Sequence, residues 1–264
     1  MGTALITGAA RGIGWNFSKR FAADGHDLVL VDVDKKQLEE SANILTDLYG
    51  TKIRLIVKDL TKFNSSWDVF AETSRHSIQV DYLVNNAGFG TYGKFQDTDC
   101  YKTEKMLYLN ICTLTNLTRL FVKRMIEQGS GKILNVSSTS AFQPMPYMAA
   151  YGASKSYVYY FSQALRENLK GTGVTVTTLC PGPTKTAFWD IASTEKSWLF
   201  KIMKPLPVEE VVRQGYLGLM KGKRLVIPGW RHKAMAFLAR IDVLNIATKA
   251  TDWLQKERFN EVKK

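Results

Sequence analysis

The chain has 264 residues, of which 45% are hydrophobic and 23% are charged, with a formal net charge of +12 at pH 7. This composition is typical of a folded globular protein and excludes disordered and collagen-like chains. No apolar run is long enough to span a bilayer, and an apolar strand already begins at residue 3, which leaves no room for a cleavable targeting segment. The three cysteines lack metal-ligand spacing, so we expect no metal and a reducing, cytoplasmic location. The positive charges are scattered, which argues against nucleic acid as a partner.

Apolar segments alternate with amphipathic segments along the chain. Strands are predicted at residues 3–7, 27–32, 52–57, 80–85, 132–137, 174–180 and 224–228. Helices are predicted at about residues 12–24, 35–49, 102–128, 150–170 and 208–220. This alternation predicts an α/β fold in which a mostly parallel, doubly wound, seven-stranded sheet carries helices on both faces. No linker or repeat interrupts the pattern, so we expect one domain over residues 1–229.

A glycine-rich turn follows the first predicted strand. Gly8, Gly12 and Gly14 allow a tight turn and let the backbone approach a pyrophosphate at the N-terminus of the next helix. Their spacing is not the Gly-x-Gly-x-x-Gly fingerprint, and an ordinary strand-to-helix loop is the alternative. However, the second strand ends at Asp32, eighteen residues past Gly14, where an acidic residue can bind a ribose diol. The two features together favour a dinucleotide site.

A second group of residues predicts proton-transfer chemistry. Tyr151 and Lys155 are one helical turn apart, so the ammonium is expected beside the phenol, where it would lower the phenol pKa toward the neutral range. Ser138 ends a predicted strand thirteen residues earlier and could hold the reacting oxygen. The same Tyr-x-x-x-Lys spacing recurs at Tyr101 and Lys105, without a serine or a preceding strand. Only the Tyr151 copy is therefore predicted to be catalytic.

These residues resemble the short-chain dehydrogenase/reductase family over most of the chain. Six features in the family's order carry the resemblance: residues 7–14, residues 59–61, residues 85–88, Asn110, the set Ser138, Tyr151 and Lys155, and residues 181–186. The resemblance implies a Rossmann-type fold with ligands at the carboxyl ends of the strands.

The resemblance also implies roles for individual residues. It implies that Ser138 holds a substrate carbonyl, that Tyr151 transfers the proton, that Lys155 tunes Tyr151, and that Asn110 helps to hold a water that links Lys155 to solvent. The cofactor contacts that it implies are Thr7, Gly8, Arg11, Gly12, Ile13, Gly14, Asp32, Asp59, Leu60, Asn86, Ala87, Gly88, Tyr151, Lys155, Pro181, Gly182, Thr184 and Thr186.

The choice of nicotinamide cofactor depends on the end of the second strand. Asp32 can accept a hydrogen bond from a free 2′-hydroxyl and would repel a 2′-phosphate, which favours NAD over NADP. Arg11, Lys35 and Lys36 are the residues that favour NADP instead.

Aromatic residues after the motifs suggest an apolar substrate of medium to large size, a secondary alcohol or ketone. Residues 184–207 are long and without clear periodicity, as in a substrate lid. The candidate pocket residues are Phe89, Tyr92, Phe142, Met145, Phe188, Trp189 and Trp198, although any of them could simply pack the lid onto the sheet.

The C-terminus departs from the family pattern, because residues 230–264 extend beyond the last strand as a predicted helical extension. Its apolar residues at helical spacing are Ala234, Phe237, Leu238, Ile241, Leu244 and Ala247. We expect this stripe to dock on its own domain or on a second subunit, and a weak contact with a membrane surface is the alternative. A homodimer is therefore as plausible as a homotetramer.

The function predicted from the sequence is an NAD(P)-dependent oxidoreductase that interconverts a secondary alcohol and a ketone, with NAD(H) favoured. One alternative is an NADP(H)-dependent carbonyl or 3-oxoacyl reductase. An alternative of a different class is a non-catalytic nucleotide-binding or membrane-peripheral interaction protein. The substrate and the direction of the reaction stay open.

Overall fold

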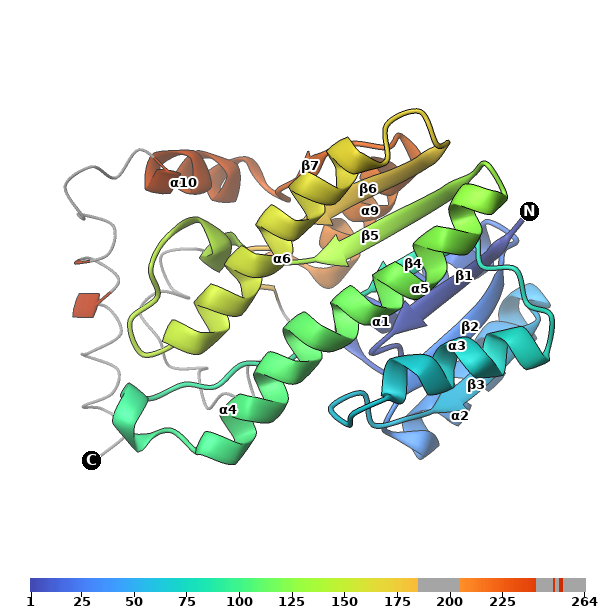
Figure 1. The fold of residues 1–264 in the computed structure, drawn as a ribbon, viewed down its shortest axis with the longest axis horizontal. Coiled ribbons are helices and arrows are strands. Elements are labelled where there is room, and N and C mark those ends of the chain that lie inside the picture. Colours follow the sequence, from blue (N-terminus) through green and yellow to red (C-terminus); the bar gives the residue numbers. More distant parts are fainter. Residues whose placement is uncertain (185–204, 241–248, 250–251, 254–264) are drawn as a thin grey trace.

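The computed structural model describes residues 1–184, 205–240, 249 and 252–253, and they form an α/β fold around one sheet (Figure 1). All strand pairs are parallel, and the strand order is β3-β2-β1-β4-β5-β6-β7. The strands are β1 (Thr3–Thr7), β2 (Asp27–Asp32), β3 (Ile53–Val57), β4 (Tyr82–Asn85), β5 (Gly131–Val136), β6 (Val174–Leu179) and β7 (Leu225–Val226). The seven predicted strands are confirmed within a few residues at their ends.

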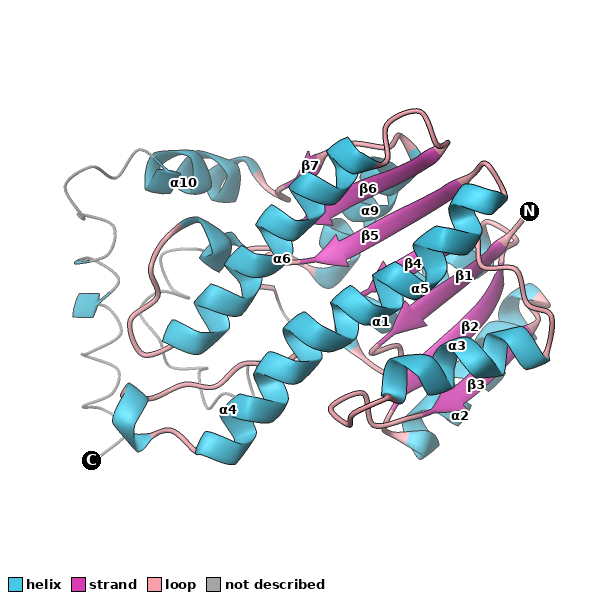
Figure 2. Ribbon diagram, in the orientation of Figure 1, coloured by secondary structure: helices cyan, strands magenta, loops and turns pink. Residues whose placement is uncertain are grey.

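Helices cover both faces of the sheet (Figure 2). The α-helices are α1 (Gly12–Ala23), α2 (Lys35–Tyr49), α3 (Ser65–Arg75), α4 (Cys100–Leu107), α5 (Leu114–Glu127), α6 (Ala149–Asn168), α9 (Val208–Met220) and α10 (Trp230–Arg240). Short turns of other helix types are η1 (Phe95–Asp97), η2 (Tyr108–Thr113) and η3 (Thr139–Phe142). Helices α1, α2 and α9 pack on one face of the sheet, and α3, α5 and α6 pack on the other.

The strand residues divide between two apolar cores because successive side chains of a strand point to opposite faces. In β1, Ala4 and Ile6 pack with α1 and α9, whereas Leu5 between them packs with α5. All three are fully buried. A strand buried on both faces must be apolar throughout, which explains why the sequence pattern of β1 is a continuous run.

The region predicted as one long helix over residues 102–128 is interrupted. Helix α4 leads into the π-helical segment η2, and α5 follows without a loop. Asp99 caps the start of α4 by accepting from the Lys102 backbone N–H at 3.0 Å. A π-helical turn contains one extra residue and often marks a functional site. Here that segment contains Asn110.

Buried polar side chains link the two central strands to α5 and α6. Asn85 Nδ2 donates to Asn135 Oδ1 and to Thr118 Oγ1, each at 2.9 Å. Asn135 Nδ2 in turn donates to Ser162 Oγ at 2.9 Å. Because these groups are hidden from water, each broken bond would leave a buried polar atom unpaired. This series of hydrogen bonds therefore fixes the register of β4 and β5 beneath the site.

The predicted C-terminal helix is present as α10, but Phe237 and Leu238 of its predicted docking face do not pack on the same domain, and docking on a second subunit stays a prediction. Phe237 and Leu238, expected to dock, are 63% and 67% exposed, whereas His232 and Ala236 are buried. Helix α10 packs on the domain through a small side chain, since Ala236 lies in one apolar cluster with Phe142. Ile241, Leu244 and Ala247 lie outside the described residues. Among the helices that the structure describes, none combines the length and the apolar character that a membrane crossing requires.

Candidate functional site

The loops at the carboxyl ends of the strands contain most of the predicted site residues. The glycine turn follows β1, Asp32 ends β2, residues 86–88 follow β4, Ser138 follows β5 and Pro181 follows β6. Because parallel strands end at one edge of the sheet, these residues lie along a common crevice.

The glycine turn is shaped by contacts that a side chain would prevent. Gly8 and Gly12 have φ of 65° and 56°, in the left-handed region that favours glycine. A Cβ on Gly14 would lie 2.0 Å from the Gly8 carbonyl oxygen. The turn therefore folds back on the start of α1, next to Ile13, and leaves a backbone cradle of the kind that a pyrophosphate occupies.

Asp32 fastens the end of β2 to the glycine turn. Its Oδ2 accepts from the Ala10 N–H at 2.9 Å, and its Oδ1 accepts from the Val33 and Asp34 N–H groups at 2.7 and 3.1 Å. Arg11 forms an ion pair with Asp34, with Nη2 2.6 Å from Oδ2. Arg11, one of the three candidate cations for a 2′-phosphate, is thus already paired.

Thr7 and Asn86 connect the ends of β1 and β4. Thr7 Oγ1 accepts from the backbone N–H groups of Asn86 and Ala87, both at 3.0 Å. Asn86 Nδ2 donates to the carbonyl oxygens of Thr7 and Gly8 at 2.9 and 3.1 Å. These four bonds hold the floor of the crevice in place.

The segment after β3 is tied to the end of η2. Asp59 Oδ1 accepts from the backbone N–H and the hydroxyl of Thr61 at 2.9 and 2.7 Å. The Leu60 carbonyl oxygen accepts from Thr113 Oγ1 at 2.7 Å. Asp59 and Leu60 lie just after β3, at the carboxyl edge of the sheet, and their contact with a cofactor stays a prediction.

Tyr151 and Lys155 lie on the first two turns of α6 and are buried, with 8% and 6% of their surface exposed. Lys155 Nζ lies 5.8 Å from the centroid of the Tyr151 ring. It also donates to the Val136 carbonyl oxygen at 3.1 Å, which links α6 to the end of β5.

Burial shifts the two pKa values in opposite directions. Burial raises the pKa of Tyr151 to about 12, and hydrogen bonds with Ser138 and Ser140 offset only part of the rise. Burial lowers the pKa of Lys155 to about 8. The expected lowering of the Tyr151 pKa by Lys155 is therefore not found, because removal of the phenolate from water outweighs other effects. At neutral pH the phenol carries its proton.

Asn110 and Lys155 approach each other beside Gly88. A Cβ on Gly88 would lie 2.8 Å from Asn110 Oδ1 and 3.3 Å from Lys155 Nζ, so only glycine fits between them without displacement. Asn110 Nδ2 donates to the Phe89 carbonyl oxygen and to Ser154 Oγ, at 3.1 and 3.0 Å. Its Oδ1 is buried and has no hydrogen-bond partner among the described residues. It is therefore an acceptor available to a water or a ligand.

Ser138 and Pro181 are held together by the turn η3. Ser138 Oγ accepts from the Ser140 N–H at 3.1 Å and caps this turn. The Thr139 N–H donates to the Pro181 carbonyl oxygen at 2.9 Å. Thr184 Oγ1 donates to the Gly182 carbonyl oxygen at 2.9 Å. Thr186 and most of the predicted lid lie outside the described residues.

The predicted pocket residues divide into two groups. Phe89, Tyr92 and Met145 pack in one cluster with Tyr151, whereas Phe142 packs beneath α10 with Cys180. Phe188, Trp189 and Trp198 lie outside the described residues.

Two further serines, Ser140 and Ser154, contact Tyr151 and Asn110 respectively and were not predicted from the sequence. The run of hydroxyl residues from Ser137 to Ser140 was the available signal for Ser140.

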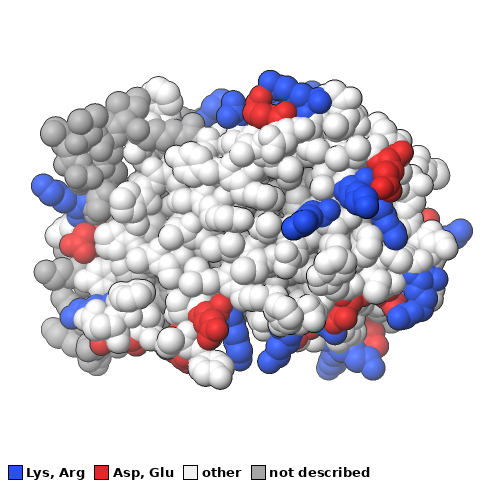
Figure 3. All heavy atoms as spheres, viewed as in Figure 1, with Lys and Arg blue, Asp and Glu red and all other residues white. Residues whose placement is uncertain are grey.

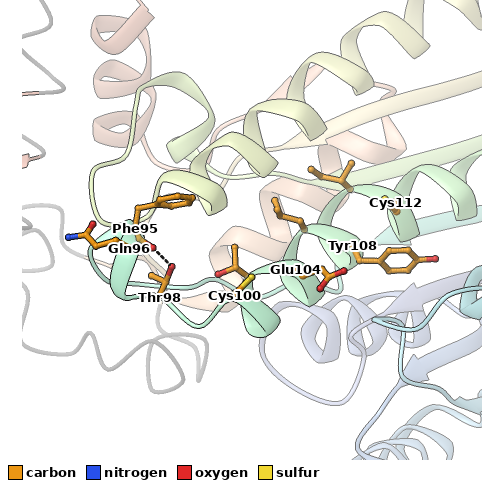
Figure 4. Close-up of a pocket in the computed structure, with 10 residues that line it drawn as sticks. Phe95, Gln96, Thr98, Cys100, Glu104, Tyr108 and Cys112 are labelled. Atoms are coloured by element: carbon orange, nitrogen blue, oxygen red, sulfur yellow. Dashed lines mark hydrogen bonds between the residues drawn. The ribbon is translucent and has the colours of Figure 1, made fainter.

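A separate groove of about 660 Å³ lies between η1 and the outer side of α4 and η2 (Figure 4). It is lined by Phe95, Gln96, Thr98, Cys100, Thr103, Glu104, Leu107, Tyr108, Ile111 and Cys112. None of the predicted catalytic residues lines it, so it is distinct from the crevice.

Comparison with known proteins agrees with this geometry. The sequence model of the short chain dehydrogenases matches residues 2–197. The very-long-chain 3-oxoacyl-CoA reductase of Anas platyrhynchos is 33% identical over 182 residues, which are 67% of this chain and 58% of the reductase. The first curated relatives are all longer, and the matched regions span less than three fifths of their length.

Two solved structures are similar over nearly the whole chain. The short-chain dehydrogenase from Sphingobium yanoikuyae, in complex with NADPH, has a TM-score of 0.81 and 31% identity, and the match covers 95% of this chain and 94% of that one. The bulky-bulky ketone specific alcohol dehydrogenase from Comamonas testosteroni has a TM-score of 0.77 and 28% identity, with 94% and 96% covered. Together with the crevice and its buried tyrosine and lysine, these matches establish that the chain belongs to the short-chain dehydrogenase/reductase family of oxidoreductases, which act with NAD or NADP.

Proposed function

We propose that this protein interconverts a secondary alcohol and a ketone on an apolar substrate of medium to large size, with NAD(H) as its preferred cofactor. The observation that carries the proposal is the buried Tyr151, protonated at neutral pH, beside Ser138 and Lys155 at the carboxyl edge of the sheet. The glycine cradle and the acceptor pattern of Asp32 fit a dinucleotide at the same edge.

The mechanism assigns one task to each side chain. A bound nicotinamide supplies the hydride for reduction or accepts it in oxidation. In reduction, the Ser138 hydroxyl holds the substrate carbonyl oxygen, and Tyr151 gives its proton to that oxygen as negative charge develops on it. The Lys155 ammonium stabilises the resulting tyrosinate. Oxidation runs the same steps in reverse, with tyrosinate as the base.

Proton return to Tyr151 needs a route through the protein. We assign Asn110 Oδ1 the task of accepting a hydrogen bond from a water that links Lys155 to solvent. The support is that Asn110 Oδ1 is buried and lies against Gly88 together with Lys155 Nζ.

The preference for NAD is supported by charges around the adenosine end of the crevice. Asp32 would repel a 2′-phosphate, and Arg11 is paired with Asp34. Lys35 and Lys36 and the NADPH-bound Sphingobium neighbour support the opposite preference. Replacement Asp32→Asn removes the charge and keeps an acceptor for the turn. We expect the ratio of kcat/KM for NADH to that for NADPH to fall about ten-fold or more, and an unchanged ratio would overturn the preference.

The substrate class is supported by the apolar cluster around Tyr151 and by the ketone named for the Comamonas neighbour. The duck reductase supports the alternative of an NADP(H)-dependent carbonyl or 3-oxoacyl reductase. A screen of bulky ketones, secondary alcohols and 3-oxoacyl thioesters with both cofactors, followed by NAD(P)H absorbance, separates the two.

The same screen tests the interaction-protein alternative. If the chain is an enzyme, Tyr151→Phe abolishes turnover and leaves NADH binding nearly intact, because only the ionisable oxygen is removed. Cofactor binding without turnover on any panel member by the wild type would favour the non-catalytic alternative.

We propose that a second copy of the chain binds the face that contains α5 and α6. In Figure 3, the middle of this face has few charged side chains, and the lysines and arginines lie toward its rim. Tyr157 and Tyr160 of α6 are exposed there. Light scattering after size-exclusion chromatography would distinguish a dimer or tetramer from a monomer, and Tyr160→Glu is expected to weaken the assembly.

We also propose a weak contact between α10 and an anionic membrane surface. Trp230, Phe237 and Leu238 are exposed on this helix, with Arg231 and Lys233 also exposed beside them. Co-sedimentation with phosphatidylserine vesicles, lost in Phe237→Glu, would support the contact. Equal sedimentation with neutral vesicles would contradict the electrostatic part.

We also propose a cytoplasmic location and a division between one catalytic domain over residues 1–229 and a C-terminal extension. Cys100, Cys112 and Cys180 form no disulfide among the described residues, which supports a cytoplasmic location. We propose that residues 230–264 form a C-terminal extension packed on the domain or on a partner subunit, and the packing of Ala236 with Phe142 and Cys180 supports the first. Imaging of a fluorescent fusion tests the location. The melting temperature of a chain truncated after residue 229 tests whether the extension is separable from the domain.

A further inference from the structure

Helix α10 reaches the cofactor crevice through one buried side chain. His232 is only 2% exposed. A Cβ placed on Gly182 would lie 2.6, 2.7 and 2.8 Å from the Nδ1, Cγ and Cε1 atoms of the His232 ring. The imidazole therefore packs directly against the Gly182 backbone, in the segment that follows β6.

The His232 ring is itself held in place by the start of the helix. Its Nδ1 lies 3.2 Å from the Pro228 carbonyl oxygen, which accepts a hydrogen bond in the tautomer protonated at Nδ1. One turn further along, Ala236 packs with Phe142 and Cys180. Helix α10 thus contacts both the turn after Ser138 and the end of β6.

The contact at Gly182 is coupled to the reacting groups by a short path. Gly182 follows Pro181, whose carbonyl oxygen accepts from Thr139 N–H at 2.9 Å. Thr139 follows Ser138, whose hydroxyl hydrogen-bonds Tyr151. A displacement of Gly182 would therefore move the segment that faces the cofactor and alter the turn that presents Ser138.

We propose that His232 is a positioning residue for the cofactor: its ring fixes the Pro181–Gly182 segment against the nicotinamide end of the crevice. This inference rests on the proposed function, in which that segment contacts the cofactor. It makes α10 a structural part of the active site, and it explains why the small face of α10 is docked while its large apolar residues face outward.

The test first creates a clash between residue 182 and the His232 ring, and then removes it. Gly182 does not have a positive φ, so Gly182→Ala introduces no backbone strain, and the three atoms nearest to the added Cβ all belong to the His232 ring. We expect the Kd and KM for NADH to rise about ten-fold, with a smaller change in kcat. The His232→Ala single variant should bind NADH about three-fold more weakly than the wild type, and the double variant Gly182→Ala/His232→Ala, which lacks the ring that clashes, should return to the affinity of that single variant.

Two further variants separate positioning from general stability. His232→Asn, which can still donate to the Pro228 carbonyl oxygen, should retain more NADH affinity than His232→Ala. Gly171→Ala, whose added Cβ would have no neighbouring atom within 4 Å, should leave NADH affinity unchanged. Melting temperatures measured for every variant show whether affinity follows stability instead.

NADH binding is measured directly, by calorimetry and by NADH fluorescence, so the result does not depend on knowing the substrate. If the wild type fails to bind NADH, the proposed function is wrong. If the wild type binds NADH and the double variant is no better than Gly182→Ala, or His232→Ala binds as tightly as the wild type, the role of His232 is wrong.

Discussion

Two copies of the Tyr-x-x-x-Lys spacing occur in this chain, and their geometry is almost the same. Lys155 Nζ lies 5.8 Å from the Tyr151 ring centroid, and Lys105 Nζ lies 5.8 Å from the Tyr101 ring centroid. Both pairs lie near the start of a helix, in α6 and in α4. The spacing therefore determines the distance between the two side chains, as helix geometry requires.

The surroundings of the two pairs are opposite. Tyr101 is 74% exposed and Lys105 is also exposed, whereas Tyr151 and Lys155 are buried. Only the buried pair has a serine hydroxyl beside the phenol and a backbone carbonyl that accepts from the ammonium. The Tyr-x-x-x-Lys spacing therefore sets the distance between the two side chains, whereas burial changes their pKa values and makes proton transfer possible.

The largest expected difference between the copies comes from removal of the phenol oxygen. Tyr151→Phe should lower kcat by about a thousand-fold or more, because no other described group is placed to give the proton. Tyr101→Phe should stay within two-fold of the wild type. Steady-state kinetics on a substrate from the carbonyl screen measure both, and equal effects would remove the distinction between the copies.

Substitution of the two lysines should have different effects on kcat and on the free energy of unfolding. Lys155→Met should lower kcat about a hundred-fold, since no cation then stabilises the tyrosinate. It should also raise the free energy of unfolding at pH 7 by about 2 kcal/mol. Burial lowers the Lys155 pKa from 10.5 to about 8, which corresponds to a cost of about 3 kcal/mol for the buried cation. Loss of the Lys155 hydrogen bond offsets about 1 kcal/mol of this gain.

The sign of the stability effect can be checked against pH. The folded state binds Lys155's proton less tightly than the unfolded state, so the penalty is full below pH 8 and disappears toward pH 10.5. The stabilisation by Lys155→Met should therefore shrink over that range in urea unfolding curves. Lys105→Met should change neither rate nor stability measurably, and a destabilised Lys155→Met at pH 7 would contradict the burial argument.

An intermediate effect is expected at Gly88. Gly88→Ala would push Asn110 and Lys155 away from each other and should lower kcat about ten-fold and the free energy of unfolding by about 1–3 kcal/mol. The matched control is Gly171→Ala, with φ of 81° and open space around it, which should lose about 1 kcal/mol without a change in rate. A normal rate in Gly88→Ala would exclude Asn110 and Lys155 from a shared role.

The smallest effect is in the pH profile of reduction. Because the Lys155 pKa is about 8, its charged fraction falls about two-fold between pH 7 and pH 8, and kcat/KM should fall with it. Lys155→Arg stays charged over this range, so its profile should be flat there even if its rate is lower. A wild-type profile that stays level to pH 9 would show that the charge of Lys155 is not needed.

Local features of the fold could be predicted from the sequence. The seven strands follow from apolar runs, and the glycine turn follows from its glycines, because both depend on neighbours in the chain. The π-helical segment around Asn110 could not be predicted, since residues 102–128 have a continuous helical pattern and the widened turn depends on tertiary contacts. Helix α3 lies in a gap between two predicted strands, but its bounds could not be predicted because its short sequence contains only two well-packed apolar side chains, Val69 and Phe70.

The candidate site shows the same limit. Ser138, Tyr151 and Lys155 could be selected by their spacing, but the direction of the Tyr151 pKa could not, because burial sums contributions from many segments. The face of α10 that packs on its own domain could not be predicted, because the buried residues His232 and Ala236 are less apolar or smaller than Phe237 and Leu238, which are exposed.

The three backbone amides held by Asp32 limit how this protein could change its cofactor over evolutionary time. Substitution by Ala or Gly would discard the repulsion of phosphate and loosen the glycine turn in a single step, so such variants would be purged for instability before selection could favour them. Viable mutational paths would pass through Asn, Ser or Thr, or begin at Asp34, where loss of the carboxylate would release Arg11.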